Sequence, residues 1–418
     1  MTDPNATSTA WPNTPAGPEK SAFGKLLVLM ITAFIDMLGM LMILPLLPFY
    51  AKSMGAGGFV VGLLVSAFSV AQLISAPIWG RFSDRYGRRP ALIVGLASSA
   101  IAYVVFAYAD SLWLLFLSRI VQGAGGGTVS VIQAYVADAT KPEDRAKSLG
   151  WLSAATNAGV AIGPAIGSAV SAWGPHTPGL IAAALCAINI VFAARYLPEA
   201  RTVRAPNADG SKPAKPKGSR EAVFRVATHP DEPASRLILI YAIAIGAFQG
   251  TNAILALFLG YRFGVTAKTI GYFYMLIGTL SVIVRALMLG RFVDRIGEPK
   301  LSRWGLMLLS GGLLGIALSN SFYTLVPAIC LLPLGTAFTF PCVTAMLSRV
   351  VSSAERGLYM GVQQTYGGIT RIGFPILFGI AFDAIGKPSP FLISATLVLA
   401  TLLLGRDLEK YSPRVKTT

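Results

Sequence analysis

Charged side chains are scarce in this sequence, and so are the residues that most often bind metals or form disulfides. Asp, Glu, Lys and Arg make up 13% of its 418 residues, whereas soluble domains carry about 25%. The two histidines, His176 and His229, both fall between apolar stretches. Cys186, Cys330 and Cys342 stand at unrelated spacings, which favours neither a disulfide framework nor a zinc site.

Nucleotide-binding and hydrolytic signatures are also missing. The sequence contains no G-x-x-x-x-G-K-[ST] segment, so nothing in it would cradle the phosphates of ATP. It also lacks the clustered His, Asp or Ser groups that an intramembrane hydrolase needs. We therefore expect no cofactor and no enzymatic activity, and an ion gradient is the expected driving force for any transport.

Apolar residues, in contrast, make up 54% of the chain, and the mean hydropathy is +0.62. They come in runs of about 20 residues, long enough to cross the hydrocarbon core of a bilayer. The pattern predicts an all-α membrane protein of twelve transmembrane helices. The expected spans are 25–49, 58–80, 90–109, 111–137, 148–173, 178–198, 237–261, 268–290, 301–319, 322–347, 357–382 and 388–405.

The formal net charge of +16 is spread unevenly over the loops. Lys and Arg crowd the loops after the even-numbered spans, and the other loops carry little more than Lys52, Arg262, Lys268 and Lys387. This asymmetry follows the positive-inside rule and predicts that both termini are cytoplasmic. It explains the basic excess without nucleic acid, which we exclude as a partner. The short loops are typical of a bacterial inner-membrane protein.

Two halves of the chain resemble each other. Eleven residues that begin at Gly80 recur 210 positions later from Gly290, each time after a long apolar run. Gly163 and Gly373 keep the same offset. A duplicated unit with an even number of spans predicts two parallel six-helix repeats, related by an axis along the membrane normal.

This duplication suggests the domain organisation. The polar segment 199–236 is rich in Pro, Lys and Ser, which favours a solvated cytoplasmic linker between the repeats. The expected units are a disordered cytosolic tail (1–23), an N-terminal six-helix half (24–198), the linker (199–236), a C-terminal six-helix half (237–406) and a cytosolic tail (407–418).

Three motifs resemble those of the major facilitator superfamily, and especially of its drug:proton antiporter branch. The loop after the second span matches G-x-x-x-D-R-x-G-R-R, the fourth span matches R-x-x-x-G, and the fifth matches the antiporter motif G-x-x-x-G-P-x-x-G. The matching residues are Gly80, Asp84, Arg85, Gly87, Arg88 and Arg89, then Arg119 and Gly123, then Gly159, Gly163, Pro164 and Gly167.

Within that branch, the first span is similar to that of tetracycline efflux proteins. Their D-x-x-G-x-x-x-x-x-P-x-x-P pattern is matched at Asp36, Gly39, Pro45 and Pro48. Those proteins carry further membrane carboxylates in the third and ninth spans. The matching regions here read Ile101-Ala102-Tyr103 and Leu309-Ser310-Gly311, which argues against tetracycline itself as the substrate.

Asp36 is a carboxylate well inside a span. An aspartate at the centre of a bilayer costs about 2.5–3.5 kcal/mol on insertion scales, so we expect it to face a cavity or a partner. Proton exchange, attraction of a cationic substrate and a helix-anchoring hydrogen bond all remain open for it. The resemblance implies that Arg119 tunes proton release from Asp36, although Arg119 could also snorkel to lipid headgroups.

The resemblance also implies a cytoplasmic gate, in which opposed charges at helix ends hold the inner mouth closed. In the second copy, Glu298 and Pro299 replace two of the arginines, which predicts a weaker gate there. For the antiporter motif we expect helix packing, with a kink at Pro164. The expected gate residues are Gly80, Asp84, Arg85, Gly87, Arg88, Asp138, Asp294 and Arg295.

Two deep arginines stand out in the second half. Arg285 is close enough to the cytoplasmic end for snorkelling to explain it. Arg371 lies about halfway along its span and could bind an anionic substrate group, pair with Asp36, or bind backbone carbonyls. Mid-span amides near aromatics suit an amphipathic substrate. The candidate substrate residues are Gln133, Asn157, Gln249, Asn252, Gln363 and Arg371.

The expected function is proton-coupled export of a small amphipathic compound, such as a drug or toxic metabolite, by alternating access. The expected partners are that substrate, protons and the lipid bilayer, with the protein acting as a monomer. One alternative is a carrier of the same fold for a lipid or an anionic metabolite. Another is a membrane sensor that binds a ligand without net transport.

Overall fold

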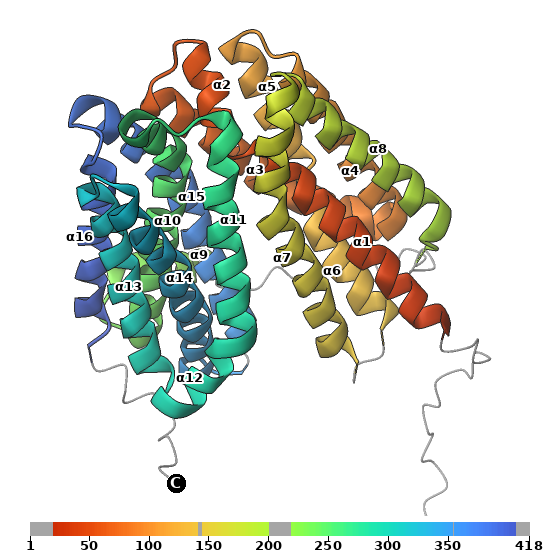
Figure 1. Cartoon of the computed structure of the whole chain (residues 1–418). Helices are drawn as coiled ribbons and strands as arrows, with labels where there is room; N and C mark the ends of the chain where they lie inside the picture. Colours follow the sequence, from red (N-terminus) through yellow and green to blue (C-terminus); the bar gives the residue numbers. More distant parts are fainter. Residues whose placement is uncertain (1–19, 141–143, 200–218, 354, 407–418) are drawn as a thin grey trace, which may run out of the picture.

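The computed structural model describes residues 20–140, 144–199, 219–353 and 355–406. In these ranges every regular element is a helix (Figure 1). The first half holds α1 (Lys20–Ile43), α2 (Leu47–Ser53), α3 (Gly58–Tyr86), α4 (Arg88–Ala107), α5 (Leu112–Ala124), α6 (Thr128–Ala139), α7 (Arg145–Val170), η1 (Ser171–Trp173) and α8 (Thr177–Tyr196). The second half holds α9 (Ser219–Thr228), α10 (Pro233–Phe263), α11 (Ala267–Ile283), the π-helix η2 (Val284–Met288), α12 (Leu289–Ile296), α13 (Glu298–Leu318), α14 (Phe322–Val350), α15 (Arg356–Ala384) and α16 (Ser389–Leu404).

These helices confirm the twelve-span, all-α prediction. Within the described ranges, ten helical stretches are long and apolar enough to cross a membrane, and α16 is a shorter apolar helix. The glycine-rich α7 is the twelfth. Three of the ten stretches consist of consecutive pieces, namely α1 with α2, α5 with α6, and α11 with η2 and α12.

Glycine turns at equivalent places support the predicted repeat. Gly87 and Gly297 join α3 to α4 and α12 to α13, with φ values of 101° and 82° and ψ values of 162° and 154°. Positive φ is easily adopted only by glycine, so this sharp reversal depends on the residue that both copies retain. We call the side of the bundle with these two turns the motif face. The side with the turns at Gly57, Gly174, Gly264 and Gly386 is the opposite face.

The two halves touch through α7 with α11 and through α3 with α15. Ser168 Oγ donates to the Ala267 carbonyl at 2.7 Å and accepts from the Gly271 amide at 2.7 Å. On the other side, Ser66 Oγ donates to the Ile372 carbonyl at 2.7 Å. Ser168, Ala267 and Gly271 lie near the opposite-face ends of their helices. Figure 1 shows the ribbons of α7 and α11 diverging toward the motif face.

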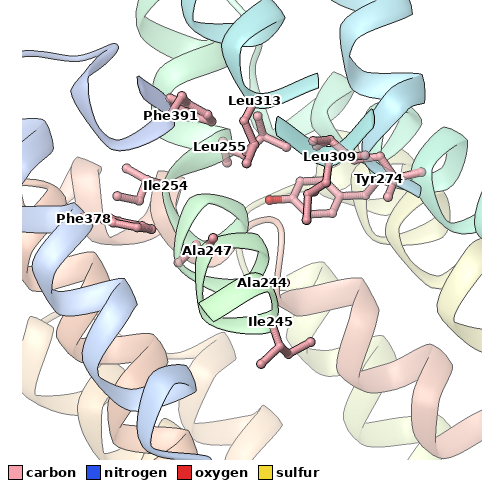
Figure 2. Close-up of a cluster of buried hydrophobic side chains, with 14 of the residues drawn as sticks. Ala244, Ile245, Ala247, Ile254, Leu255, Tyr274, Leu309, Leu313, Phe378 and Phe391 are labelled. Atoms are coloured by element: carbon pink, nitrogen blue, oxygen red, sulfur yellow. The ribbon is translucent and has the colours of Figure 1, made fainter. Parts of the chain in front are cut away.

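The second half has a dense apolar core around α10. Figure 2 shows Ile254 and Leu255 of α10 surrounded by Leu309, Phe378 and Phe391 from three other helices. The Phe258 and Phe391 rings also pack, with centroids 4.7 Å apart. Lipid is as apolar as these side chains, so close van der Waals packing holds such helices together. This dense packing fixes the position of α10, one of the helices that line the space between the halves.

The structure adds a helix to the predicted linker. Residues 200–218 lie outside the described ranges, but α9 packs on α10 and α15 through buried Ala222 and Val226. The Tyr366 hydroxyl of α15 donates to the Val223 carbonyl at 2.9 Å. Segment 199–236 as a whole is rich in Pro and Lys, so its average composition did not indicate the short amphipathic helix α9. Of the predicted tails, residues 1–19 of 1–23 and all of 407–418 also lie outside the described ranges, and α1 begins at Lys20, inside the predicted first tail.

Candidate functional site

A cavity of ≈ 390 Å³ lies between the two halves. Most of its wall belongs to the first half, and α10 and α15 close it from the second half. It contains two guanidinium groups and one carboxylate among hydroxyls, amides and apolar side chains. We call it the central cavity; its lining residues are Asp36, Met37, Met40, Leu44, Val65, Phe68, Ser69, Gln72, Ser99, Tyr103, Arg119, Gln122, Gly126, Thr128, Val129, Gln249 and Arg371.

Asp36 is buried at the edge of the central cavity, with 4% of its surface exposed. Thr128 Oγ1 donates a hydrogen bond to Asp36 Oδ2 at 2.7 Å. Thr128 is the first residue of α6, so the positive end of that helix's dipole lies beside the carboxylate. A hydrogen bond and a helix N-terminus both stabilise the ionised form, whereas burial disfavours it. The site can therefore hold this group either ionised or protonated.

A break in the fourth span brings Thr128 to Asp36. Helix α5 ends at Ala124 and α6 begins at Thr128, with three glycines between them. Side chains of α3 bind the carbonyls at the break: Gln72 Nε2 donates to Gly126 at 3.2 Å and Ser75 Oγ donates to Gly123 at 3.2 Å. Such backbone breaks are tolerated inside membranes when neighbouring groups satisfy the freed carbonyls.

The i, i+4 spacing of Gly123 and Gly127 would by itself favour a continuous glycine face along the fourth span. Gly123 does pack tightly, because an added Cβ would lie 2.4 Å from the Phe68 carbonyl oxygen. The helix, however, is interrupted before Gly127. Three successive glycines in mid-span were the signal for a break, and Thr128 was missed with it.

Arg119 lies in the same cavity with 1% of its surface exposed. Its Nε and Nη2 atoms have no hydrogen-bond partner among the described residues, and its guanidinium lies 5.8 Å from the centroid of the Phe106 ring. No ion pair joins Arg119 to Asp36 in the described part of the chain. Arg119 is buried inside the protein rather than at the lipid headgroups, so any influence on Asp36 acts through space.

Tyr103 is a second cavity residue that the sequence reasoning did not select. It accepts a hydrogen bond on its hydroxyl from Gln122 Nε2 at 2.9 Å. Tyr103 lies in the region of the third span where this sequence lacks the carboxylate of tetracycline efflux proteins. In the structure, its hydroxyl supplies a polar group to the cavity at this position.

The six candidate substrate residues are divided among three places. Gln249 and Arg371 line the central cavity, and both continue into an adjoining pocket of ≈ 50 Å³ that Asn252 also lines. Gln133 and Asn157 line a separate pocket of ≈ 210 Å³ between α1, α6 and α7. Gln363 is fully buried and accepts from Thr344 Oγ1 at 3.4 Å, so it faces α14 and none of these cavities.

At the motif face, Arg88 draws together the ends of three helices. Its Nε lies 3.0 Å from Asp138 at the end of α6, and its Nη1 lies 3.0 Å from Asp84 at the end of α3. The carboxylate of Glu199 accepts from the Arg88 amide at 2.8 Å and from the Arg89 amide at 3.1 Å. These contacts stay within the first half. Gly80, Arg85, Asp294 and Arg295 are exposed on the same face.

The second copy has an ion pair of its own. Glu298, the first residue of α13, accepts from Arg349 Nη2 at 2.7 Å, and only 8% of its side chain is exposed. The sequence reasoning treated Glu298 as the loss of an arginine and expected a weaker gate. It missed that a residue of opposite charge, Arg349, stands near the end of α14 to receive it.

The antiporter motif lies against the backbone of α1. An added Cβ would lie 2.5 Å from the Phe34 carbonyl oxygen at Gly159, 2.7 Å from that of Leu38 at Gly163 and 2.2 Å from that of Met42 at Gly167. Pro164 instead faces the second half, where its carbonyl oxygen would lie 2.0 Å from a Cβ at Gly271. The motif thus packs α7 on α1 and lets α11 approach closely.

At the opposite face, a carboxylate joins the two halves. Asp383, near the end of α15, accepts from the amides of Gly58 and Phe59 at 2.9 Å each, at the start of α3. Lys387 Nζ lies 4.0 Å from the same carboxylate. No group of three or more potential metal ligands occurs among the described residues.

Comparison with known proteins identifies the family. A model described as Major Facilitator Superfamily matches residues 29–299 and 237–417. Multidrug resistance protein 2 of Bacillus subtilis (strain 168) is 28% identical over 383 residues, which cover 90% of this chain and 93% of the relative. The class B tetracycline resistance protein of Escherichia coli is 27% identical over 361 residues, covering 85% and 88%.

Solved transporter structures share the fold. The human organic anion transporter MFSD10 (TETRAN) superposes with a TM-score of 0.65 at 23% identity, covering 93% of this chain and 100% of that one. The nucleoside transporter NupG gives a TM-score of 0.73 at 17% identity, covering 92% and 99%. This chain is an integral, multi-pass membrane protein that belongs to the Major Facilitator Superfamily.

Proposed function

We propose that this protein exports a small amphipathic compound across the membrane in exchange for protons, by alternating access. The observation that carries the proposal is the buried carboxylate of Asp36 in a cavity that both halves line. The relatives named as multidrug and tetracycline resistance proteins support a drug or toxic metabolite as the cargo. We take the motif face to be cytoplasmic, in line with the distribution of basic residues.

With that orientation, the structure corresponds to a state closed toward the outside. The contacts between the halves at Ser168 and Ser66, and the two amide contacts of Asp383, lie from the membrane centre outward. Substrate would reach the central cavity from the cytoplasm through the space where α7 and α11 diverge. Rocking of one half against the other would then break the outer contacts and open the cavity to the outside.

Asp36 would bind a proton from the outside and release it to the cytoplasm. Thr128 and the α6 N-terminus favour the ionised group, and the apolar surroundings favour the protonated one. A modest change of surroundings during rocking is therefore enough to alter the balance. Arg119, buried in the same cavity, would add to the stability of the ionised state.

The motif-face ion pairs would make each half move as a unit. Arg88 ties the α3–α4 turn to α6, and Glu298 with Arg349 ties the α12–α13 turn to α14. Because neither pair crosses between the halves, they would stiffen the helix ends rather than lock one half to the other.

Everted membrane vesicles test the proposal. Tetracyclines, tetraphenylphosphonium and aromatic carboxylates would each be offered to vesicles with an acid interior, and accumulation would be followed with time. We expect at least one class to accumulate only in vesicles that contain the protein, and to be lost when an uncoupler collapses the proton gradient. Accumulation that is unchanged by the uncoupler would contradict proton coupling.

A further inference from the structure

The two walls of the space between the halves differ in charge. The central cavity contains two guanidinium groups, Arg119 and Arg371, and one carboxylate, Asp36. One positive charge is therefore uncompensated even when Asp36 is ionised. Asp36 belongs to the first half and already accepts from Thr128, whereas the second half contributes only positive charge to the cavity.

Arg371 is the cationic group of the second wall. It lies near the middle of α15, next to Ile372, whose carbonyl accepts from Ser66 across the halves. Its Nε atom is buried without a hydrogen-bond partner, and no ion pair or hydrogen bond to this side chain occurs in the described part of the chain. A membrane-buried arginine normally pairs with an acid or with carbonyls. The Arg371 guanidinium lacks such a partner among the described residues, and a ligand can supply it.

Arg285 continues the positive wall toward the motif face. It belongs to the π-helix η2, and π-helical turns within α-helices frequently mark functional sites. Arg285 lines a groove of ≈ 610 Å³ together with Tyr241, Phe340, Thr344 and Ser348. These residues come from α10, η2 and α14. The Arg285 side chain is exposed, and no carboxylate of the described residues lines the groove.

This arrangement offers Arg285 a role besides snorkelling to lipid headgroups. Its guanidinium borders a groove with two aromatic rings, Tyr241 and Phe340, whose centroids are 5.5 Å apart. Aromatic and apolar surface beside a guanidinium with no ion-pair partner among the described residues suits a ligand that carries an apolar ring system and one negative charge.

We propose that the exported compound carries an anionic group, such as a carboxylate, which passes Arg285 and binds Arg371 in the central cavity. This inference rests on the proposed export function and specifies its substrate class. The anion and the proton would occupy separate groups on opposite walls, Arg371 and Asp36. Exchange of the anion for the proton would then depend on the alternating conformations of the protein, because the two do not compete for one side chain.

Matched ligand triplets test this charge preference without requiring transport. Purified full-length protein in lipid nanodiscs would be titrated with 2-naphthoate, 2-naphthamide and 2-naphthylmethylammonium, and with the equivalent biphenyl triplet. We expect the carboxylate to bind at least tenfold more tightly than the amide of the same ring system. Arg371→Gln should remove this preference, Arg371→Lys should keep part of it, and Arg285→Gln should slow association.

The control is Arg195→Gln, which removes an exposed arginine from the last turn of α8, away from the cavity. It should bind all six compounds as the wild type does. Equal binding of carboxylate and amide, tighter binding of the ammonium compound, or no binding of either carboxylate to folded wild-type protein would each overturn the inference. So would an Arg371→Gln variant that keeps the preference. The proposed export function fails separately, through loss of gradient-driven accumulation in vesicles.

Discussion

Glu298 and Arg349 repeat, with exchanged charges, the relationship between Arg88 and Asp138. Arg88 and Glu298 are both the first residues of helices that follow a glycine turn, and they stand 210 positions apart. Their partners lie in the same half as each of them, near the ends of α6 and α14, at distances of 3.0 Å and 2.7 Å. The two halves have therefore kept the ion pair while reversing its direction.

Because the ion pair is reversed between the two halves, we predict that the Glu298–Arg349 pair tolerates exchange of its two charges. Glu298→Arg alone would place two cations together, with Glu298 largely buried and Arg349 half exposed. We expect a loss of about 1–3 kcal/mol in the free energy of unfolding, less than for a fully buried pair. Adding Arg349→Asp should restore most of it. Thermal unfolding of the purified variants measures both effects; a double variant no better than the single one would contradict the pairing.

Thr128→Val should impair transport while leaving the fold intact. The substitution removes the hydroxyl that donates to Asp36 but keeps nearly the same volume. A hydrogen bond to a charged group contributes about 1.5–3 kcal/mol, so we expect the rate of proton-driven export to fall roughly tenfold or more. Thr128→Ser keeps the donor and should retain most of the rate. Equal activity of the Val and Ser variants would show that this hydrogen bond has no part in coupling.

The glycines of α7 offer a matched pair of substitutions. Gly167→Ala would place a Cβ 2.2 Å from the Met42 carbonyl oxygen, whereas Gly150→Ala meets nothing within 4 Å. Both are helical, so Gly150→Ala should be neutral or slightly stabilising. Gly167→Ala forces α1 and α7 apart and should cost about 1–3 kcal/mol. Thermal unfolding of the two variants compares them directly, and equal stability would contradict the tight packing of the motif.

Asp383 should bias the protein toward the state described here. Its carboxylate binds two amides at the start of α3, and these contacts join the halves at the opposite face. Asp383→Ala removes both contacts. We expect the population open at that face to rise about tenfold, which corresponds to about 1.4 kcal/mol.

Spin labels at Trp113 and Tyr323 can report this shift, because both side chains are exposed and begin helices at the opposite face of different halves. The distance distribution should gain a longer component in Asp383→Ala. Lys52→Ala, which alters an exposed charge on the same face, serves as the control. An unchanged distance distribution in Asp383→Ala would show that this carboxylate does not control opening at the opposite face.

Much of this architecture could be predicted from the sequence because its signals are local and repeated. Apolar runs of bilayer length gave the spans, and the recurrence of Gly87 as Gly297 gave the halves. A carboxylate in a membrane span has to be buried beside polar groups, so the position of Asp36 alone predicted that it faces a cavity or a partner. Such inferences need no knowledge of which helices are neighbours.

The remaining features depend on contacts between distant segments. Thr128 reaches Asp36 only because the helix breaks at three glycines, and that break depends on Gln72 and Ser75 of another helix. The partner of Glu298 lies 51 residues away, so charge alone could not identify it. Gln363 has the polar amide expected of a cavity residue, yet helix rotation turns it toward α14.

Proton release measured on Asp36→Asn tests the central claim most directly. Vesicles containing wild type, Asp36→Asn or the exposed-loop control Asp110→Asn would be loaded with a pH-sensitive dye. Each would then receive the compound identified by gradient-driven accumulation. The account predicts substrate-induced proton release in the wild type and in Asp110→Asn, and none in Asp36→Asn although that variant still binds substrate. Undiminished proton release from Asp36→Asn would contradict the assignment of proton exchange to this residue.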